Sequence, residues 1–392
     1  MQFHRPCQVF SCAVMALIAL LLPAPARGQP KVTPIVPLAK GQFNPDIRWA
    51  IDFSSDGSLI ATCGNYVRVY EVKTGKLVHD IEGKFTKAIA FNAIAFNAIA
   101  FSPATPNQFV AGGVDGVLSL WQVGKKAVVR EFRGHDGVIW SAAVDKSGKY
   151  AATGSVRYQE GKAALGQFRL WEIETGKAAQ SLDVKDGAIQ GVSFSGDGKL
   201  VAFCRNMNTD ASSVEVYHVQ PWKLASSVKL SAGANLETTK WGKAVPFGLS
   251  TRFVPDQKRV VVAGGICVRV DPAPYPYACQ TTGLLWRADL GEASAKLLDE
   301  PQPEYYRSLG ITPDGKRFAT GNGINNAILG GKARIQMRDV ETGKTLWSAA
   351  SDAEPYAVTV SPDGETVAAG QRDGVLLLNA KTGETIRLIS AK

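Results

Sequence analysis

Residues 358–389 read VTVSPDGETVAAGQRDGVLLLNAKTGETIRLI, and this stretch decides the fold. A short β-branched run leads into Ser-Pro-Asp-Gly, and a second run of small and β-branched residues follows. A third apolar run leads to Thr-Gly at 382–383, and a fourth run, Glu384–Ile389, ends the unit. Because Asp-Gly and Thr-Gly supply the backbone freedom that tight turns need, the unit predicts four short strands joined by hairpins.

The same pattern occurs six more times, and a repeat of this length indicates a radial or solenoid fold. One such unit cannot bury both faces of its sheet, whereas seven units arranged radially bury each face against a neighbour. We therefore predict an all-β fold over residues 46–392, a single seven-bladed β-propeller of four-stranded antiparallel blades. The six further copies cover residues 51–81, 99–132, 142–182, 192–228, 251–298 and 309–347.

The repeats resemble those of the WD-repeat family over nearly the whole of this region. Gly134-His135 precedes the third unit, Asp115-Gly116 forms a tight turn, and Leu-Trp pairs at 120–121, 170–171 and 285–286 close third strands. That family often carries a hydrogen-bonded set of Trp, Ser/Thr, His and Asp within a blade. The resemblance implies structural roles for Asp115, Trp121, His135, Thr153 and Trp171, although the second unit lacks the His and the third lacks the Asp. Propellers of periplasmic and quinone-enzyme types have similar turns and stay open as alternatives.

The N-terminus has the layout of a secretory signal. Arg5 lies in a short polar start, residues 9–22 are apolar, and Ala24 and Ala26 give a small-x-small cleavage site. We predict a signal peptide over residues 1–28, an extracytoplasmic location (periplasmic or secreted) and no membrane span after cleavage; the alternative is an uncleaved anchor. Residues 29–45 form an N-terminal extension or edge strand, because KVTPIVPL at 31–38 suits a sheet edge.

Charge and cysteine content restrict the class of binding partner and the compartment. The formal net charge is +9, but basic residues are spread along the chain without runs, which argues against nucleic acid. Cys267 and Cys279 flank a Pro-rich loop, so they form either a disulfide in an oxidising compartment or a pair of free thiols. We predict no cofactor, a protein partner and a monomeric propeller.

Residues 88–101 repeat the motif AIAFN, with AIAF occurring three times. Strand side chains alternate with a period of two, so a shift of five residues exchanges the two faces. We expect Ala98–Phe101 to form the inner strand, because Ser102-Pro103 follows it. The earlier copies then lengthen the preceding loop, either as a tolerated insertion or as a binding loop.

Long loops point to the functional surface. The second-to-third-strand connections Ser155–Gln167, Arg205–Ser213, Ile266–Thr282 and Asn322–Lys332, together with Ser231–Pro246 between the fourth and fifth blades, should emerge on one face of blades three to six. Tyr, Trp and Arg dominate protein interfaces. The candidate binding residues are Arg157, Tyr158, Arg205, Asn206, Trp241, Arg269, Tyr275, Tyr277, Tyr305, Tyr306 and Arg307.

No catalytic or metal motif is apparent in the sequence. Its three histidines outside the signal, His79, His135 and His218, lack ligand spacing, and neither a Walker loop nor G-x-S-x-G occurs. The sequence therefore favours an exported, non-enzymatic interaction scaffold that binds a protein through the long loops. Two alternatives stay open: a propeller enzyme of lactonase or quinone-dependent type, and a small-ligand or glycan binder at the channel mouth.

Overall fold

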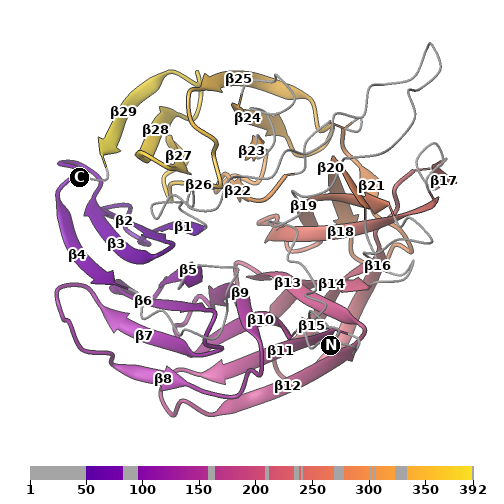
Figure 1. Cartoon of the computed structure of the whole chain (residues 1–392), viewed down its shortest axis with the longest axis horizontal. Helices are drawn as coiled ribbons and strands as arrows, with labels where there is room; N and C mark the ends of the chain where they lie inside the picture. Colours follow the sequence, from indigo (N-terminus) through magenta and orange to yellow (C-terminus); the bar gives the residue numbers. More distant parts are fainter. Residues whose placement is uncertain are drawn as a thin grey trace, which may run out of the picture.

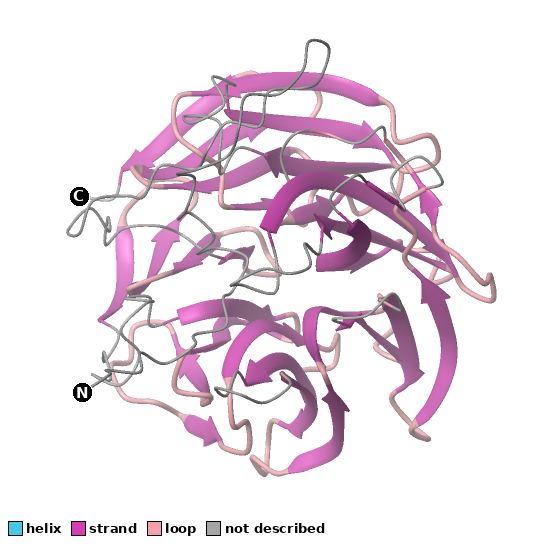
Figure 2. Ribbon diagram, turned by 45° about the vertical axis from the view of Figure 1, so that its right-hand side comes forward, coloured by secondary structure: helices cyan, strands magenta, loops and turns pink. Residues whose placement is uncertain are grey.

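The computed structural model describes residues 50–390 apart from 83–95, 158–163, 208–211, 234–237, 240–241, 269–277, 300–301, 303–305 and 323–332. In this part of the chain every regular element is a β-strand (Figure 2). The strands form seven antiparallel sheets arranged as a ring around a central axis (Figure 1). The predicted all-β seven-bladed propeller is therefore confirmed.

Each blade is built from consecutive strands, numbered from the ring axis outwards. Blade 1 comprises β1 (Ala50–Phe53), β2 (Leu59–Cys63), β3 (Tyr66–Glu71) and β4 (Leu77–Glu82). Blade 2 comprises β5 (Phe96–Ser102), β6 (Thr105–Gly113), β7 (Leu118–Gln122) and β8 (Arg130–Phe132). Blade 3 comprises β9 (Val138–Val144), β10 (Tyr150–Arg157), β11 (Leu165–Glu172) and β12 (Ala178–Lys185). Blade 4 comprises β13 (Gly187–Phe194), β14 (Leu200–Met207), β15 (Ser213–His218) and β16 (Lys223–Lys229).

Blade 5 is the largest blade, because its sheet has five strands instead of four. It comprises β17 (Thr238–Thr239), β18 (Gly242–Phe253), β19 (Arg259–Val268), β20 (Ala278–Asp289) and β21 (Lys296–Leu297). Blades 6 and 7 comprise β22 (Leu309–Ile311), β23 (Arg317–Asn322), β24 (Ala333–Asp339) and β25 (Thr345–Ser351); and β26 (Ala357–Val360), β27 (Thr366–Gln371), β28 (Gly374–Asn379) and β29 (Thr385–Ser390).

A repeated turn sets the register of the first two strands in most blades. In blade 7, Ser361 Oγ donates to Asp363 Oδ1 at 2.5 Å, and that carboxylate accepts the Glu365 amide at 3.0 Å. Gly364 follows with φ +77°, a conformation that glycine adopts without strain. Ser54 with Asp56 and Thr312 with Asp314 repeat the arrangement, which explains why Ser/Thr-x-Asp-Gly marks these hairpins.

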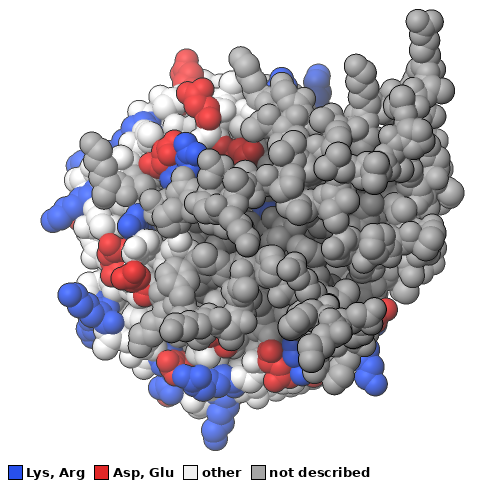
Figure 3. Space-filling model, in the orientation of Figure 1, with Lys and Arg blue, Asp and Glu red and all other residues white. Residues whose placement is uncertain are grey.

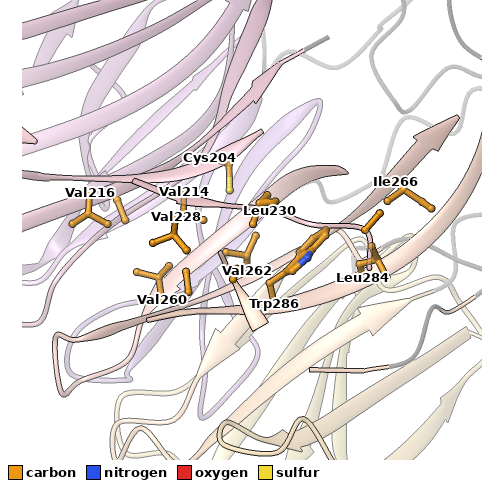
Figure 4. Close-up of a cluster of buried hydrophobic side chains, with 14 of the residues drawn as sticks. Cys204, Val214, Val216, Val228, Leu230, Val260, Val262, Ile266, Leu284 and Trp286 are labelled. Carbon is orange, nitrogen blue, oxygen red and sulfur yellow. The ribbon is translucent and has the colours of Figure 1, made fainter. Parts of the chain in front are cut away.

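The hydrophobic core consists of seven clusters, one between each pair of adjacent blades. The cluster between blades 4 and 5 joins Val214 and Val228 to Val260 and Trp286, with the Cys204 thiol buried among them (Figure 4). Burial raises the pKa of this thiol, so it remains a neutral, small apolar group. The radial design thus buries both faces of every sheet.

Ring closure needs no strand exchange among the described residues. β29 is the fourth strand of blade 7, as the sequence predicts, so blade 7 is complete from C-terminal residues alone. Ile51 and Ile60 of blade 1 pack against Leu377 and Ile389 of blade 7. Arg387 adds a hydrogen bond of 3.0 Å from its guanidinium to the Lys73 carbonyl. Residues 31–38, predicted as an edge strand, and the signal region lie outside the described residues.

The tandem repeat supplies the inner strand of blade 2 as predicted. β5 contains Ala98–Phe101, with Ile99 and Phe101 facing blade 1 and Ala98 and Ala100 facing blade 3. Its pairing with β6 shifts register between Phe96 and Ala98. The bulge at Asn97 absorbs the change of face that a five-residue repeat imposes.

Candidate interaction face

One end of the ring carries the long connections. Because successive strands are antiparallel, the link between second and third strands and the link to the next blade leave from the same end of each sheet. We call this end the loop face. The second-to-third-strand links are residues 158–164, 208–212, 269–277 and 323–332 in blades 3 to 6, against 64–65 in blade 1 and 372–373 in blade 7.

The predicted loops are too long at their ends, because strand pairing continues into them. In blade 3 the ladder extends to the pair Arg157 and Leu165, and in blade 5 it includes Ile266 with Thr282 and Val268 with Ala278. Residues 242–246, predicted as loop, belong to β18. β-branched residues such as Val156 and Ile266 favour this extension. The strands of blade 5 therefore extend further towards the loop face than predicted.

Two of the predicted binding residues are buried and serve the fold instead. Asn206 Nδ2 donates to the Gly248 carbonyl at 2.7 Å, and its Oδ1 accepts the Gly248 amide at 2.9 Å, so this side chain ties blade 4 to blade 5. Tyr306 has 0% exposure, and its hydroxyl accepts from Arg338 at 3.1 Å and donates to Asp299 at 3.3 Å. Both side chains are therefore buried in the fold, which the sequence alone does not show for a loop aromatic or amide.

Three of the predicted arginines lie on the loop face with part of the side chain accessible. Arg157 is 40% exposed and lies 3.5 Å from Asp136. Arg205 is also 40% exposed and pairs at 3.0 Å with the buried carboxylate of Glu215. Arg307 is half-buried, and its charge lowers the pKa of Glu354, although burial has the larger effect and raises that pKa overall. These groups combine hydrogen-bonding capacity with fixed positions.

Sequence reasoning missed an adjoining group in blade 7. Glu354 accepts a 2.8 Å hydrogen bond from the Tyr356 hydroxyl, and Arg372 also lowers the pKa of Glu354. The search was confined to long connections, and residues 352–356 and 372–373 are short ones. The signal available was the Glu-Pro-Tyr sequence at 354–356, which precedes the inner strand as Tyr305-Tyr306-Arg307 does in blade 6.

Several predicted residues lie outside the described part of the chain. These are Tyr158, Trp241, Arg269, Tyr275, Tyr277 and Tyr305. Cys267 and Cys279 lie on the neighbouring strands β19 and β20, but their side chains are not described, so the disulfide stays a prediction.

A buried polar set in blade 3 positions part of the loop face. His135 Nε2 lies 2.6 Å from Thr153 Oγ1, the Trp171 indole N–H donates to the same oxygen at 2.8 Å, and His135 Nδ1 lies 2.8 Å from Ser155 Oγ. The backbone amide of the next residue, Asp136, donates to Gln167 Oε1 at 2.8 Å. This set anchors the segment that carries Asp136 beside Arg157.

The corresponding set does not assemble in blade 2. Asp115 Oδ1 accepts the Val117 amide at 3.1 Å within its own turn, and the buried Trp121 indole N–H has no hydrogen-bond partner among the described residues. Trp286 does not occupy the same position in its strand as Trp171, although both follow a Leu in the sequence. Trp171 is the next-to-last residue of β11, whereas Ala288 holds that position in β20. Trp286 instead donates to the Ser231 carbonyl at 2.8 Å and holds the connection between blades 4 and 5.

Two opposite charges lie on inner strands of different blades. Asp52 in β1 and Arg252 in β18 each immediately precede the Phe that ends the strand, and each side chain is partly exposed. Asp52 Oδ2 accepts the Phe101 amide at 2.9 Å. Burial raises the pKa of Asp52 to about 6, although this hydrogen bond and Arg252 oppose the shift. The ionised carboxylate is therefore held at a cost to stability.

We expect Asp52→Asn to stabilise the protein at pH 8 by about 1 kcal/mol, a fraction of the roughly 1.4 kcal/mol per pKa unit that linkage allows. Because the folded protein favours the protonated carboxyl, Asp52 contributes its full stabilisation below pH 3.8. This contribution is lost as the pH rises through about 6. The gain over wild type should consequently shrink between pH 8 and pH 4. Urea unfolding at both pH values measures it, and an equal difference at the two would contradict the assignment.

Neither a metal centre nor a membrane-spanning helix is apparent in the described residues. No group of three or more His, Cys, Asp or Glu side chains there is arranged to hold a metal ion. No helix in the same part of the chain is long and apolar enough to cross a bilayer.

Comparison with known proteins agrees with the blade architecture. Residues 126–158 match the family "WD domain, G-beta repeat", which here covers β8, β9 and β10. Eukaryotic translation initiation factor 3 subunit I of Eremothecium gossypii is 30% identical over 108 residues, 27% of this chain and 29% of that protein. The Kluyveromyces lactis counterpart is 31% identical over 104 residues, 26% of this chain and 27% of that protein. The matches thus span less than a third of these relatives. The chain is therefore a seven-bladed β-propeller in which one repeat, at residues 126–158, is similar to the WD-repeat family.

Proposed function

We propose that this propeller is an exported, non-enzymatic scaffold that binds a protein partner through the loop face of blades 3 to 6. The observation that carries the proposal is that the second-to-third-strand links of blades 3 to 6 have five to ten residues, against two to four in blades 1, 2 and 7. Long links in a compact domain are typical of binding segments, and a rigid ring is a suitable support for them.

The chemistry of the described loop-face residues supports a protein partner. Arg157 and Arg205 are partly exposed, and each is held by a carboxylate, so little conformational entropy is lost when a partner binds. Basic and acidic side chains are interspersed around the rim that Figure 3 shows, which favours a protein surface over a polyanion. The two relatives are, by name, subunits of a larger factor, which supports membership in a complex.

The partner is best sought with the full chain exported by its own N-terminal segment, purified and used as bait on cell-envelope extract. The test variant replaces residues 270–276 by a two-residue turn and carries Arg157→Glu, which leaves the β19 and β20 ladder intact. The matched control is Lys125→Glu with Lys126→Glu, two exposed residues on the opposite face. We expect a partner that the wild type and the control capture and the test variant loses at least tenfold.

Two results would contradict this proposal. Equal capture by the test variant would place the binding site elsewhere on the ring. Capture of no protein, with a small molecule retained instead, would favour the ligand-binding or enzymatic alternatives. N-terminal sequencing of the exported protein tests its location separately, since removal of the predicted signal should leave an N-terminus between Arg27 and Gln29.

A further inference from the structure

The inner strand of blade 2 has a duplicate of itself immediately upstream. β5 spans Phe96–Ser102 and reads FNAIAFS, and residues 91–97 read FNAIAFN. The first six residues of the two segments are identical, including the Asn at the bulge. Every side chain that β5 buries, apart from that of Ser102, is therefore available a second time, five residues earlier.

The pocket that β5 fills is specified by these six side chains. Ile99 and Phe101 are 6% and 4% exposed and pack against Ala61, Val69 and Phe109. Ala98 and Ala100 pack on the other side against Val110 and Ile139. The Phe101 amide donates to Asp52, a backbone contact that any residue other than proline makes. Ile94 and Phe96 would meet the same neighbours if residues 91–97 replaced β5.

The residue after the strand also permits the replacement. In the replaced register Asn97 takes the place of Ser102. The corresponding residue in blade 3 is Asp145, whose side chain accepts the amides of Ser147 at 3.1 Å and Tyr150 at 2.6 Å. Asn has an equivalent carbonyl acceptor and is favoured in such turns. Asn97 in its present position is buried, with an Nδ2 that has no partner among the described residues.

The chain on either side is long enough for the shift. The connection from β4 would shorten from residues 83–95 to residues 83–90, which remains longer than the connections 133–137 and 352–356 of other blades. The hairpin between β5 and β6 would lengthen from residues 103–104 to residues 98–104. Loop closure entropy rises only slowly with length, so the longer hairpin is tolerated.

We propose that blade 2 exchanges between two registers, in which either residues 96–102 or residues 91–97 form its inner strand. The exchange moves five residues from the loop face to the opposite face of the ring. Each register gives five residues to the connection on one face at the expense of the connection on the other, so the duplication links the two faces of the propeller.

Substitutions of the repeated isoleucine test the exchange, since Ile89 and Ile94 precede β5 whereas Ile99 lies within it. Ile51 in β1 is the matched control, because it is 5% exposed and lies two residues before a Phe of the inner strand, as Ile99 does, but has no duplicate. The variants are Ile99→Asp, Ile51→Asp, the pair Ile89→Asp with Ile94→Asp, and the triple change at 89, 94 and 99.

We expect the fall in Tm of Ile99→Asp to be less than half that of Ile51→Asp, because residues 91–97 replace the damaged strand. The pair should leave Tm unchanged, and the triple variant should fall as far as Ile51→Asp. Hydrogen exchange of Ile99→Asp should show residues 91–97 protected and residues 98–104 open. Exchange is disproved if Ile99→Asp falls as far as Ile51→Asp, or if the triple variant is no worse than Ile99→Asp.

Discussion

The free energy of unfolding is expected to fall less on acidification from pH 7 to pH 4.5 when His135 is replaced with Gln, by about 2–3 kcal/mol. Burial is the main reason that the pKa of His135 falls to about 3, and the nearby Arg169 charge lowers it further. Because the folded protein favours the neutral imidazole, His135 contributes its full stabilisation above pH 6.5. This contribution is lost as the pH falls below that value. Each pH unit below 6.5 therefore costs about 1.4 kcal/mol until the folded state itself binds the proton.

The contacts of the ring explain why the proton is resisted. Thr153 Oγ1 already accepts the Trp171 indole N–H, and the neutral imidazole can accept the Thr153 hydroxyl proton at one nitrogen while donating to Ser155 at the other. Protonation makes both ring nitrogens donors, so the Thr153 hydroxyl must reorient. His135 is 8% exposed, so water does not solvate the charge of the protonated ring.

Urea unfolding of wild type and His135→Gln at pH 7 and pH 4.5 provides the measurement. The variant will be less stable at pH 7, because Gln cannot fill the ring's position beside Trp171. Its loss on acidification should nevertheless be smaller than the wild-type loss by about 2–3 kcal/mol. The turn carboxylates titrate in both proteins and cancel in this difference. Parallel losses would mean that His135 is hydrated or charged in the folded protein.

The sequence predicted the blades well because each blade is a local structure. The Asp-Gly and Thr-Gly turns fix hairpins between neighbours in the chain, and the fourth strand of blade 7 was apparent from Glu384–Ile389. Position within a strand was harder, because a Leu-Trp pair alone does not give the register. Trp286 looked equivalent to Trp171, yet the pairing of Arg259 with Asp289 places it two residues earlier.

The site was less predictable because burial depends on contacts between blades. Asn206 looked like a loop amide, but its two hydrogen bonds reach Gly248 in the next blade. Tyr306 looked like an interface aromatic, but Arg338 and Asp299 from two different blades bind its hydroxyl. A long loop can be read from one segment, whereas the direction of its side chains depends on a segment distant in sequence. Arg157 and Arg205 stayed accessible because their carboxylate partners lie beside them at the same edge.

Arg338 leads to the second large expectation, because it occupies in blade 6 the position that Trp171 has in blade 3. Both are the next-to-last residue of the third strand. The guanidinium is 4% exposed and lies 2.7 Å from Asp299 of blade 5. It also donates to the Gly343 carbonyl at 3.0 Å, whereas its Nε has no partner among the described residues. Among the described residues, this buried cation is paired with the carboxylate of Asp299.

Asp299→Ala should therefore lower the free energy of unfolding by about 3 kcal/mol, since removing one partner of a buried pair leaves the other uncompensated. The double variant Arg338→Met with Asp299→Leu should recover most of this loss, because an apolar pair of similar volume avoids desolvating two charges. Urea unfolding of wild type, Arg338→Met, Asp299→Leu and the double variant completes the cycle, with Asp299→Ala measured beside them. If Asp299→Ala stays within about 0.5 kcal/mol of wild type, water or another group neutralises Arg338. In that case the junction of blades 5 and 6 is held by its apolar cluster around Leu285 and Phe318 and not by the ion pair.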